Sequence, residues 1–148
     1  MIEIRIGLET DFPELRETAA LDLLKLVFTT EGISIADCTL VFVDDDQLGD
    51  LKKQFFGVDQ YTDVIAFRMN EYDEAPVEGE IYISVPRARA NAVEFGEPFG
   101  RELARLIVHG ALHLLGHEDD TDDRRQAMRE QEEQYLGQFD WRKLLLTG

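Results

Sequence analysis

The chain of 148 residues carries 31 acidic and 15 basic residues, a formal net charge of −16, and 44% of its residues are hydrophobic. This length and composition suit one domain with a buried core, here residues 1–148, and exclude a largely disordered chain. The single cysteine, Cys38, excludes an intrachain disulfide and a multi-cysteine zinc site. The excess of acids argues against a broad basic surface for nucleic acid, because attraction to phosphates dominates such binding.

Neither a membrane span nor a signal peptide is visible in the sequence. No apolar run approaches the roughly 18 to 20 residues that a transmembrane helix needs. The N-terminal segment MIEIRIGLETDF has acids where a signal peptide has a basic region, and it lacks an apolar stretch. We therefore expect a cytoplasmic protein with no membrane partner.

The first half of the chain alternates between strand and helix patterns. Residues 2–8 alternate apolar and polar side chains, as in a half-buried strand. Thr10 or Asp11 is suited to cap a following helix, with Pro13 in its first turn. The predicted elements are a strand at 2–8, a helix from Thr10 or Asp11 to Gly32, a strand at 39–43 and a helix at 47–56.

The second half predicts two strands followed by helices, and its last residues form a small apolar tail. The expected elements are strands at 62–69 and 80–85 around a loop, and helices at 86–94, 101–115 and 122–136. The tail, Leu144 to Leu146 with Phe139 and Trp141, can dock on the core or on another subunit, and we expect the core. This order predicts an α+β fold in which helices pack on a small mixed four-stranded sheet, with a metal-binding helix in the C-terminal half.

All three histidines lie in the segment HGALHLLGHED. His109 and His113 are four residues apart on a predicted helix, so their rings project from one face and can bind one metal ion at about 2.0 to 2.1 Å. Gly116 is suited to end that helix, which lets Asp119 supply a third ligand from the loop. Three protein ligands leave a position for water, as in catalytic sites. We predict one divalent ion per chain, with zinc the first choice and nickel, cobalt and manganese left open.

The residues around this cluster have less specific roles. His117 can reach the metal, move a proton or lie exposed at the turn. Glu118 and His117 are the nearest candidates for proton transfer, and His113 is catalytic as a metal ligand. Gly110 occupies the position where H-E-x-x-H peptidases carry their general base, which disfavours that peptidase mechanism.

Three motifs, YTDVIAF, GEIYIS and HGALHLLGHED, follow one another between about Leu51 and Met128. Together they resemble the YbeY family of bacterial single-strand endoribonucleases, which act in ribosomal RNA maturation and ribosome quality control. The matching positions are Thr62, Asp63, Val64, Ile65, Phe67, Gly79, Glu80, Ile81, Ile83, Ser84, His109, Gly110, Leu112, His113, Leu114 and Gly116.

The chain departs from the family pattern at two positions. Asp119 stands where most members have a third histidine, and a carboxylate is a competent ligand. Phe56 stands where the family has an arginine that the resemblance associates with RNA cleavage. Lys52 and Lys53, about one helical turn away, are hypothesised to replace its charge.

Further residues are candidates for contact with the substrate. Ser84 lies at the end of the predicted strand beside the metal, where it can contact substrate or satisfy a backbone group, and Arg87 comes just after that strand. Arg101 and Arg105 are interpreted either as part of a basic patch or as partners of nearby glutamates.

The resemblance implies a metal-dependent endoribonuclease in which metal-activated water attacks a phosphodiester. It also implies ribosomal RNA and the small ribosomal subunit as partners, together with a ribosomal protein or a GTPase. A bound cation would offset part of the acidic surface locally. Two alternatives stay open: a non-catalytic ribosome-assembly factor with a structural metal, and a small peptidase-like metallohydrolase that acts on another substrate.

Overall fold

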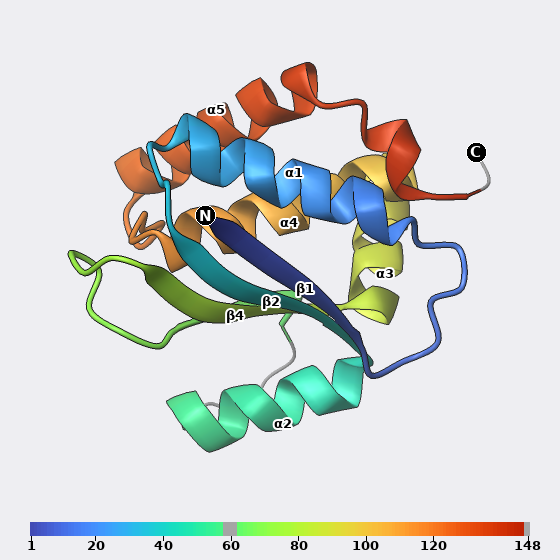
Figure 1. The fold of residues 1–148 in the computed structure, drawn as a ribbon. Coiled ribbons are helices and arrows are strands. Elements are labelled where there is room, and N and C mark those ends of the chain that lie inside the picture. Colours follow the sequence, from blue (N-terminus) through green and yellow to red (C-terminus); the bar gives the residue numbers. More distant parts are fainter. Residues whose placement is uncertain (58–61, 147–148) are drawn as a thin grey trace.

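The computed structural model describes residues 1–57 and 62–146, and within them four strands form one sheet (Figure 1). The strand order is β1-β2-β4-β3, with β1, β2 and β4 parallel and β3 antiparallel to β4. This confirms the predicted mixed sheet, and it leaves one side of β3 as a free edge. The strands are β1 (Ile2–Leu8), β2 (Ala36–Val43), β3 (Val64–Arg68) and β4 (Val77–Ser84).

Helices cover both faces of the sheet. Figure 1 shows α2 alone beneath one face, while α1, α4 and α5 lie on the other; α1 and α4 both contact the sheet, and α5 packs on α4. The predicted α+β class is therefore confirmed. The helices are α1 (Glu17–Thr30), α2 (Asp45–Phe56), α3 (Val85–Phe95), α4 (Phe99–Leu114), α5 (Asp122–Gln138) and the short 3-10 helix η1 (Trp141–Leu144).

The central strand β2 contributes to two apolar clusters. Leu40 and Phe42 lie in the main core with α1 and α4, whereas Val41 and Val43 point to the opposite face and pack with Leu48 of α2. Because side chains alternate along a strand, the part of a strand that is covered on both faces is apolar at successive positions, as residues 40–43 are here. This explains the uninterrupted run that identified the strand, whose observed start, Ala36, precedes the predicted one.

The predicted start of the first helix at Thr10 or Asp11 is wrong, because α1 begins at Glu17. The preceding segment turns at Pro13 and Glu14 and buries only Phe12 and Leu15, and Leu15 pairs with Leu145 in an isolated β-bridge. A capping pattern is local, whereas the backbone partner of this segment lies at the far end of the chain. That long-range pairing delays the helix.

The C-terminal tail docks on the core through Leu144, as predicted. Its side chain is fully buried in the main core, and its carbonyl oxygen accepts a hydrogen bond of 2.8 Å from the backbone N–H of Arg16. Tyr61, the first residue of the YTDVIAF motif, lies outside the described residues. The prediction that residues 1–148 form a single domain stays a prediction. None of the described helices combines the length and apolar character needed to cross a bilayer.

Candidate metal centre

Helix α4 presents two histidines side by side, and it lies directly on the sheet. At Gly110, a Cβ atom would be 2.6 Å from Cγ2 of Ile81 and 3.0 Å from Cγ2 of Val64, so only glycine fits this approach. On either side of this contact, the rings of His109 and His113 lie 4.6 Å apart between centroids. The same contact leaves no room for the glutamate that an H-E-x-x-H helix carries at this position.

The end of α4 turns the chain back toward these histidines. Gly116 has φ +97°, a left-handed conformation that glycine adopts at little cost. Its N–H donates to the carbonyl oxygen of His113 at 3.0 Å, and the N–H of His117 donates to that of Leu112 at 3.0 Å. These two bonds form a Schellman motif, and they confirm the predicted helix stop.

Beyond this turn, Asp119 faces both histidines. Its Oδ1 lies 3.4 Å from Nε2 of His113, and its Oδ2 lies 3.5 Å from Nε2 of His109. In a tetrahedral zinc site, bonds of 2.0 to 2.2 Å would place neighbouring ligand atoms about 3.3 to 3.5 Å apart. All three ligand atoms lie within 4.8 Å of one another, so this cluster fits a divalent metal ion.

The surroundings of the cluster favour the metal-binding form of His113. Burial lowers the pKa of His113, and the neighbouring His109 lowers it further, although Asp119 opposes both effects. A neutral imidazole is the form that binds a metal. Asp119 is about one-third exposed, so the cluster remains accessible from the surface.

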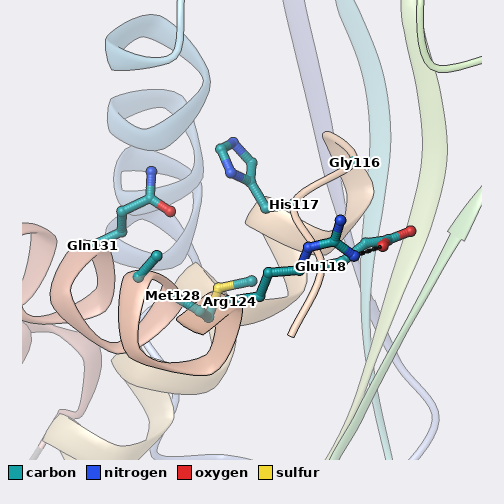
Figure 2. Close-up of a pocket in the computed structure, with 7 residues that line it drawn as sticks. Gly116, His117, Glu118, Arg124, Met128 and Gln131 are labelled. Carbon is teal, nitrogen blue, oxygen red and sulfur yellow. Dashed lines mark hydrogen bonds and ion pairs between the residues drawn. The ribbon is translucent and has the colours of Figure 1, made fainter. Parts of the chain in front are cut away.

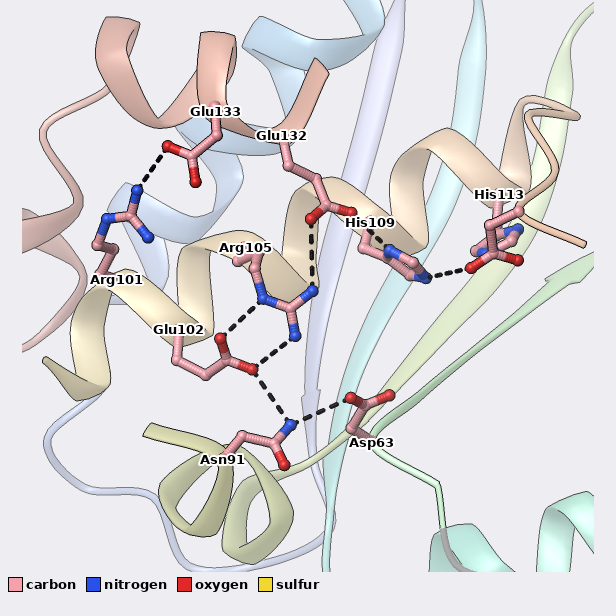
Figure 3. Close-up of polar contacts among 10 residues, drawn as sticks. Asp63, Asn91, Arg101, Glu102, Arg105, His109, His113, Glu132 and Glu133 are labelled. Carbon is pink, nitrogen blue, oxygen red and sulfur yellow. Dashed lines mark hydrogen bonds and ion pairs between the residues drawn. The ribbon is translucent and has the colours of Figure 1, made fainter. Parts of the chain in front are cut away.

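A buried carboxylate contacts the ring nitrogen of His109 that faces away from Asp119. Nδ1 of His109 lies 2.6 Å from Oε2 of Glu132, whose side chain is only 5% exposed (Figure 3). Histidine ligands commonly donate their second ring N–H to a carboxylate, which fixes the tautomer and directs the other nitrogen to the metal. Glu132 therefore orients Nε2 of His109 toward Asp119.

Glu132 is not among the residues predicted from the sequence, although α5 carries a signal for it. The buried residues of this charged helix, Met128, Glu132, Tyr135 and Leu136, follow one another at helical spacing. A single charge within such a buried stripe requires a partner inside the protein.

The network continues from Glu132 across the molecule. Arg105 contacts Glu132 at 3.4 Å and donates to the buried Glu102 at 2.7 and 2.8 Å. Asn91 on α3 donates to Glu102 at 3.2 Å and to Asp63 at 3.1 Å (Figure 3). The hydrogen bond and charge of Glu102 raise the pKa of Arg105. The network thus joins α3, α4, α5 and the segment before β3.

The arginines of α4 pair with acids, which was one of the two interpretations. Arg105 binds Glu102, and Arg101 lies 3.8 Å from Glu97 and 2.6 Å from Glu133. Their charges are therefore engaged within the protein.

Of the four predicted substrate residues, Lys52 shares a cleft with a residue of the metal cluster, His113. Lys52 and His113 line one cleft of about 520 Å³, whose described lining does not include Lys53, Ser84 or Arg87. Lys53 is exposed on α2.

Ser84 and Arg87 make structural contacts elsewhere. Ser84 is buried and caps α3, where its Oγ accepts from the backbone N–H of Arg87 and donates to Asp45 at 3.1 Å. The guanidinium of Arg87 donates to the same carboxylate at 2.7 Å. Their proposed contacts with substrate stay predictions.

The two predicted proton-transfer residues also have partners of their own. Nε2 of His117 lies 2.9 Å from Oε1 of Glu31 on α1, and Glu118 accepts from Arg124 at 2.7 Å. Figure 2 shows both side chains around a second pocket, of about 260 Å³, that is lined by residues of α5 and the preceding turn. Neither belongs to the three-residue metal cluster, and their catalytic roles stay predictions.

Comparison with known proteins identifies the family. The family model described as Endoribonuclease YbeY matches residues 9–140. The chain belongs to the YbeY endoribonuclease family. The resemblance that the three motifs carried is thereby confirmed, and with it a family of metal-binding nucleases.

Several bacterial YbeY proteins are similar to this chain over most of their length. The endoribonuclease YbeY of Desulforamulus reducens is 41% identical over an alignment that covers 78% of this chain and 85% of that protein. That of Flavobacterium psychrophilum is 36% identical over 136 residues, covering 92% and 96%. The solution structure of TM1509 from Thermotoga maritima aligns with a TM-score of 0.61 at 29% identity, covering 95% of this chain and 92% of that one.

Proposed function

We propose that this member of the YbeY family is a metal-dependent, single-strand-specific endoribonuclease that acts in ribosomal RNA maturation and ribosome quality control in the cytoplasm. The observation that carries the proposal is the convergence of His109, His113 and Asp119 beside a cleft that contains Lys52. A metal site that opens into a cleft provides both an activating ion and room for a substrate.

In this proposal, His109, His113 and Asp119 hold one ion, and two imidazoles with one carboxylate suit zinc. A bound ion lowers the pKa of a water molecule and offsets the negative charge of the phosphodiester. Glu132 keeps the proton on Nδ1 of His109, and Lys52 binds a phosphate of the RNA.

Proton transfer is assigned to His117 or Glu118, which share the loop of Asp119, and Ser84 and Arg87 remain candidate RNA contacts. Because these four side chains pair with other residues in the protein alone, their participation requires an exchange of partners when RNA binds. Single substitutions to Gln or Ala, scored by cleavage rate at saturating RNA, test each role.

Ribosomal RNA in the small subunit is the proposed substrate, with a ribosomal protein or a GTPase supplying specificity. A net charge of −16 repels free RNA at long range, so intrinsic affinity is expected to be weak and to fall as salt increases. A binding curve that stays flat from low to moderate salt would argue against phosphate contacts.

The test begins with metal content. We expect about one zinc or similar ion per purified chain, loss of that ion in Asp119→Ala, and loss of cleavage of single-stranded RNA in both Asp119→Ala and His113→Ala. Asp120→Ala is the matched control, because Asp120 is exposed and pairs with Arg124 instead. Absence of metal from the reconstituted wild-type protein would overturn the proposal.

A non-catalytic assembly factor with a structural metal is the competing function, and Phe56 in place of the family's arginine favours it. Thermal unfolding with and without a chelator separates the two. The cluster ligands lie outside the apolar core, so we expect the stripped protein to stay folded. Unfolding on chelation, with no cleavage in the loaded protein, would favour the structural role. Peptidase chemistry is disfavoured because Gly110 leaves no place for the general base.

A further inference from the structure

A cleft with aromatic walls runs along the free edge of β3 and ends at the metal centre. It measures about 520 Å³, within the range of small-ligand sites. Lys52 and Phe56 come from α2, Tyr72 from the loop between β3 and β4, and His113 from α4. We call this the aromatic cleft; its lining is Lys52, Phe56, Val64, Ile65, Ala66, Tyr72 and His113.

The ring of Phe56 is exposed but held in place. It stacks on Phe67 of β3, with ring centroids 5.7 Å apart and planes inclined by 21°. Phe67 is itself packed edge-on by Phe55 and Tyr82. Phe56 nevertheless remains 54% exposed, so it can extend this stack by one more planar group.

Tyr72 is held similarly in the loop between β3 and β4. The guanidinium of Arg68 lies 5.4 Å from its ring centroid and donates at 3.2 Å to the carbonyl oxygen of Leu114, at the end of α4. The ring also lies against Gly116, the turn that leads to Asp119. Tyr72 is 62% exposed, so a second flat surface is fixed next to the metal centre.

This chain needs an RNA contact that does not depend on net charge. With 31 acids and 15 bases it lacks the excess of positive charge on which phosphate-driven binding depends. Stacking of bases on aromatic rings is an alternative source of affinity, since every base has a flat face. Lys52, which forms no ion pair within the described residues, adds one local positive charge at the same cleft.

We propose that the aromatic cleft binds an unpaired nucleobase on Phe56 and Tyr72, while Lys52 contacts an adjacent phosphate and directs the next phosphodiester toward His113. This inference rests on the proposed function, because it assumes a single-stranded RNA substrate. A duplex keeps its bases stacked on one another, so it cannot present a base face to these rings. Phe56 thus supplies by stacking an RNA contact that the arginine of relatives would supply by charge.

The experiment measures binding of a single-stranded octaribonucleotide, with chelator present so that no cleavage occurs. Phe56→Ala and Tyr72→Ala are each expected to weaken binding about 5- to 150-fold, the range that one stacked base contributes. Phe56→Trp keeps a stacking surface, so it is expected to bind as tightly as the wild type, with indole fluorescence quenched by the RNA. Phe95→Ala is the matched control, because Phe95 is equally exposed on α3, outside the aromatic cleft.

A second probe isolates the base from the phosphates. An abasic oligomer of the same length has the phosphates without the bases, and we expect it to bind weakly and equally to the wild type and to Phe56→Ala. Equal losses in Phe56→Ala and Phe95→Ala, or equal affinity for abasic and normal RNA, would overturn the proposal and leave the exposed rings to a protein partner.

The outcome is separable from the proposed function. If Phe56→Ala cleaves RNA at the wild-type rate and affinity while His113→Ala does not cleave, the endoribonuclease stands and the stacking site fails. If the wild type binds normal RNA through Phe56 but cleaves none with any divalent metal, the stacking site stands and the endoribonuclease fails.

Discussion

Removal of the carboxylate behind His109 is expected to weaken metal binding without removing a ligand. Glu132 is almost fully buried, and its Oε2 lies 2.6 Å from Nδ1 of His109. Outer partners of this kind contribute about 10- to 100-fold to metal affinity, or about 1.4 to 2.7 kcal/mol. We expect Glu132→Ala to lose zinc affinity in this range. Glu132→Gln is expected to lose less, because its amide oxygen can still accept a hydrogen bond from the Nδ1–H of His109.

Competition with a zinc chelator at constant pH measures this loss, and circular dichroism checks that each variant is folded. Glu133→Ala is the control, because Glu133 is the next residue of α5 but is exposed and pairs with Arg101. Equal zinc affinities of folded Glu132→Ala and Glu133→Ala would refute the orienting role of Glu132. Loss of zinc in both would refute the distinction between the two faces of α5.

Three further predictions concern packing, pH and RNA. Gly110→Ala would place Cβ 2.6 Å from a side chain of β4, so we expect it to lower the free energy of unfolding in urea by about 1 to 3 kcal/mol. Gly137→Ala has open space around it, and we expect it to raise the same free energy by about 0.5 to 1 kcal/mol. Burial raises the pKa of the Cys38 thiol to about 12, so only the unfolded chain loses this proton just above pH 9. Between pH 9 and 11, the free energy of unfolding should therefore fall more for the wild type than for Cys38→Ala. An equal fall in both would contradict this prediction. Lys52→Ala is expected to weaken RNA binding several-fold in a filter-binding assay, whereas Lys53→Ala, outside the aromatic cleft, is expected to change it little. Equal losses of affinity in the two variants would contradict a role of the cleft in RNA binding.

Local patterns predicted the parts of the metal centre that lie close together in the sequence. His109 and His113 share a helix face because four residues make about one turn. Gly116 ends the helix because it adopts positive φ at little cost. These rules act within a few residues, and they were sufficient to predict a cluster with Asp119.

The remaining features depend on partners far apart in the chain. Glu132 reaches His109 across 23 residues, and His117 meets Glu31 across 86, so no local pattern connects either pair. The same reason explains the late start of α1, which yields to a bridge between Leu15 and Leu145.

The sequence by itself therefore determined the α+β class, the histidine pair with its helix stop, and the family resemblance, because periodicity, turn chemistry and motif order are local properties. The tertiary structure alone decided which of the charged residues are buried partners and which line a cleft. Phe56 illustrates this difference. In the sequence it stands where the family has an arginine, whereas in the fold it stacks on Phe67 at the free edge of β3 and lines a cleft together with His113. Its surroundings are set by how α2 and α4 pack on opposite faces of one sheet, and that packing is a property of the whole chain.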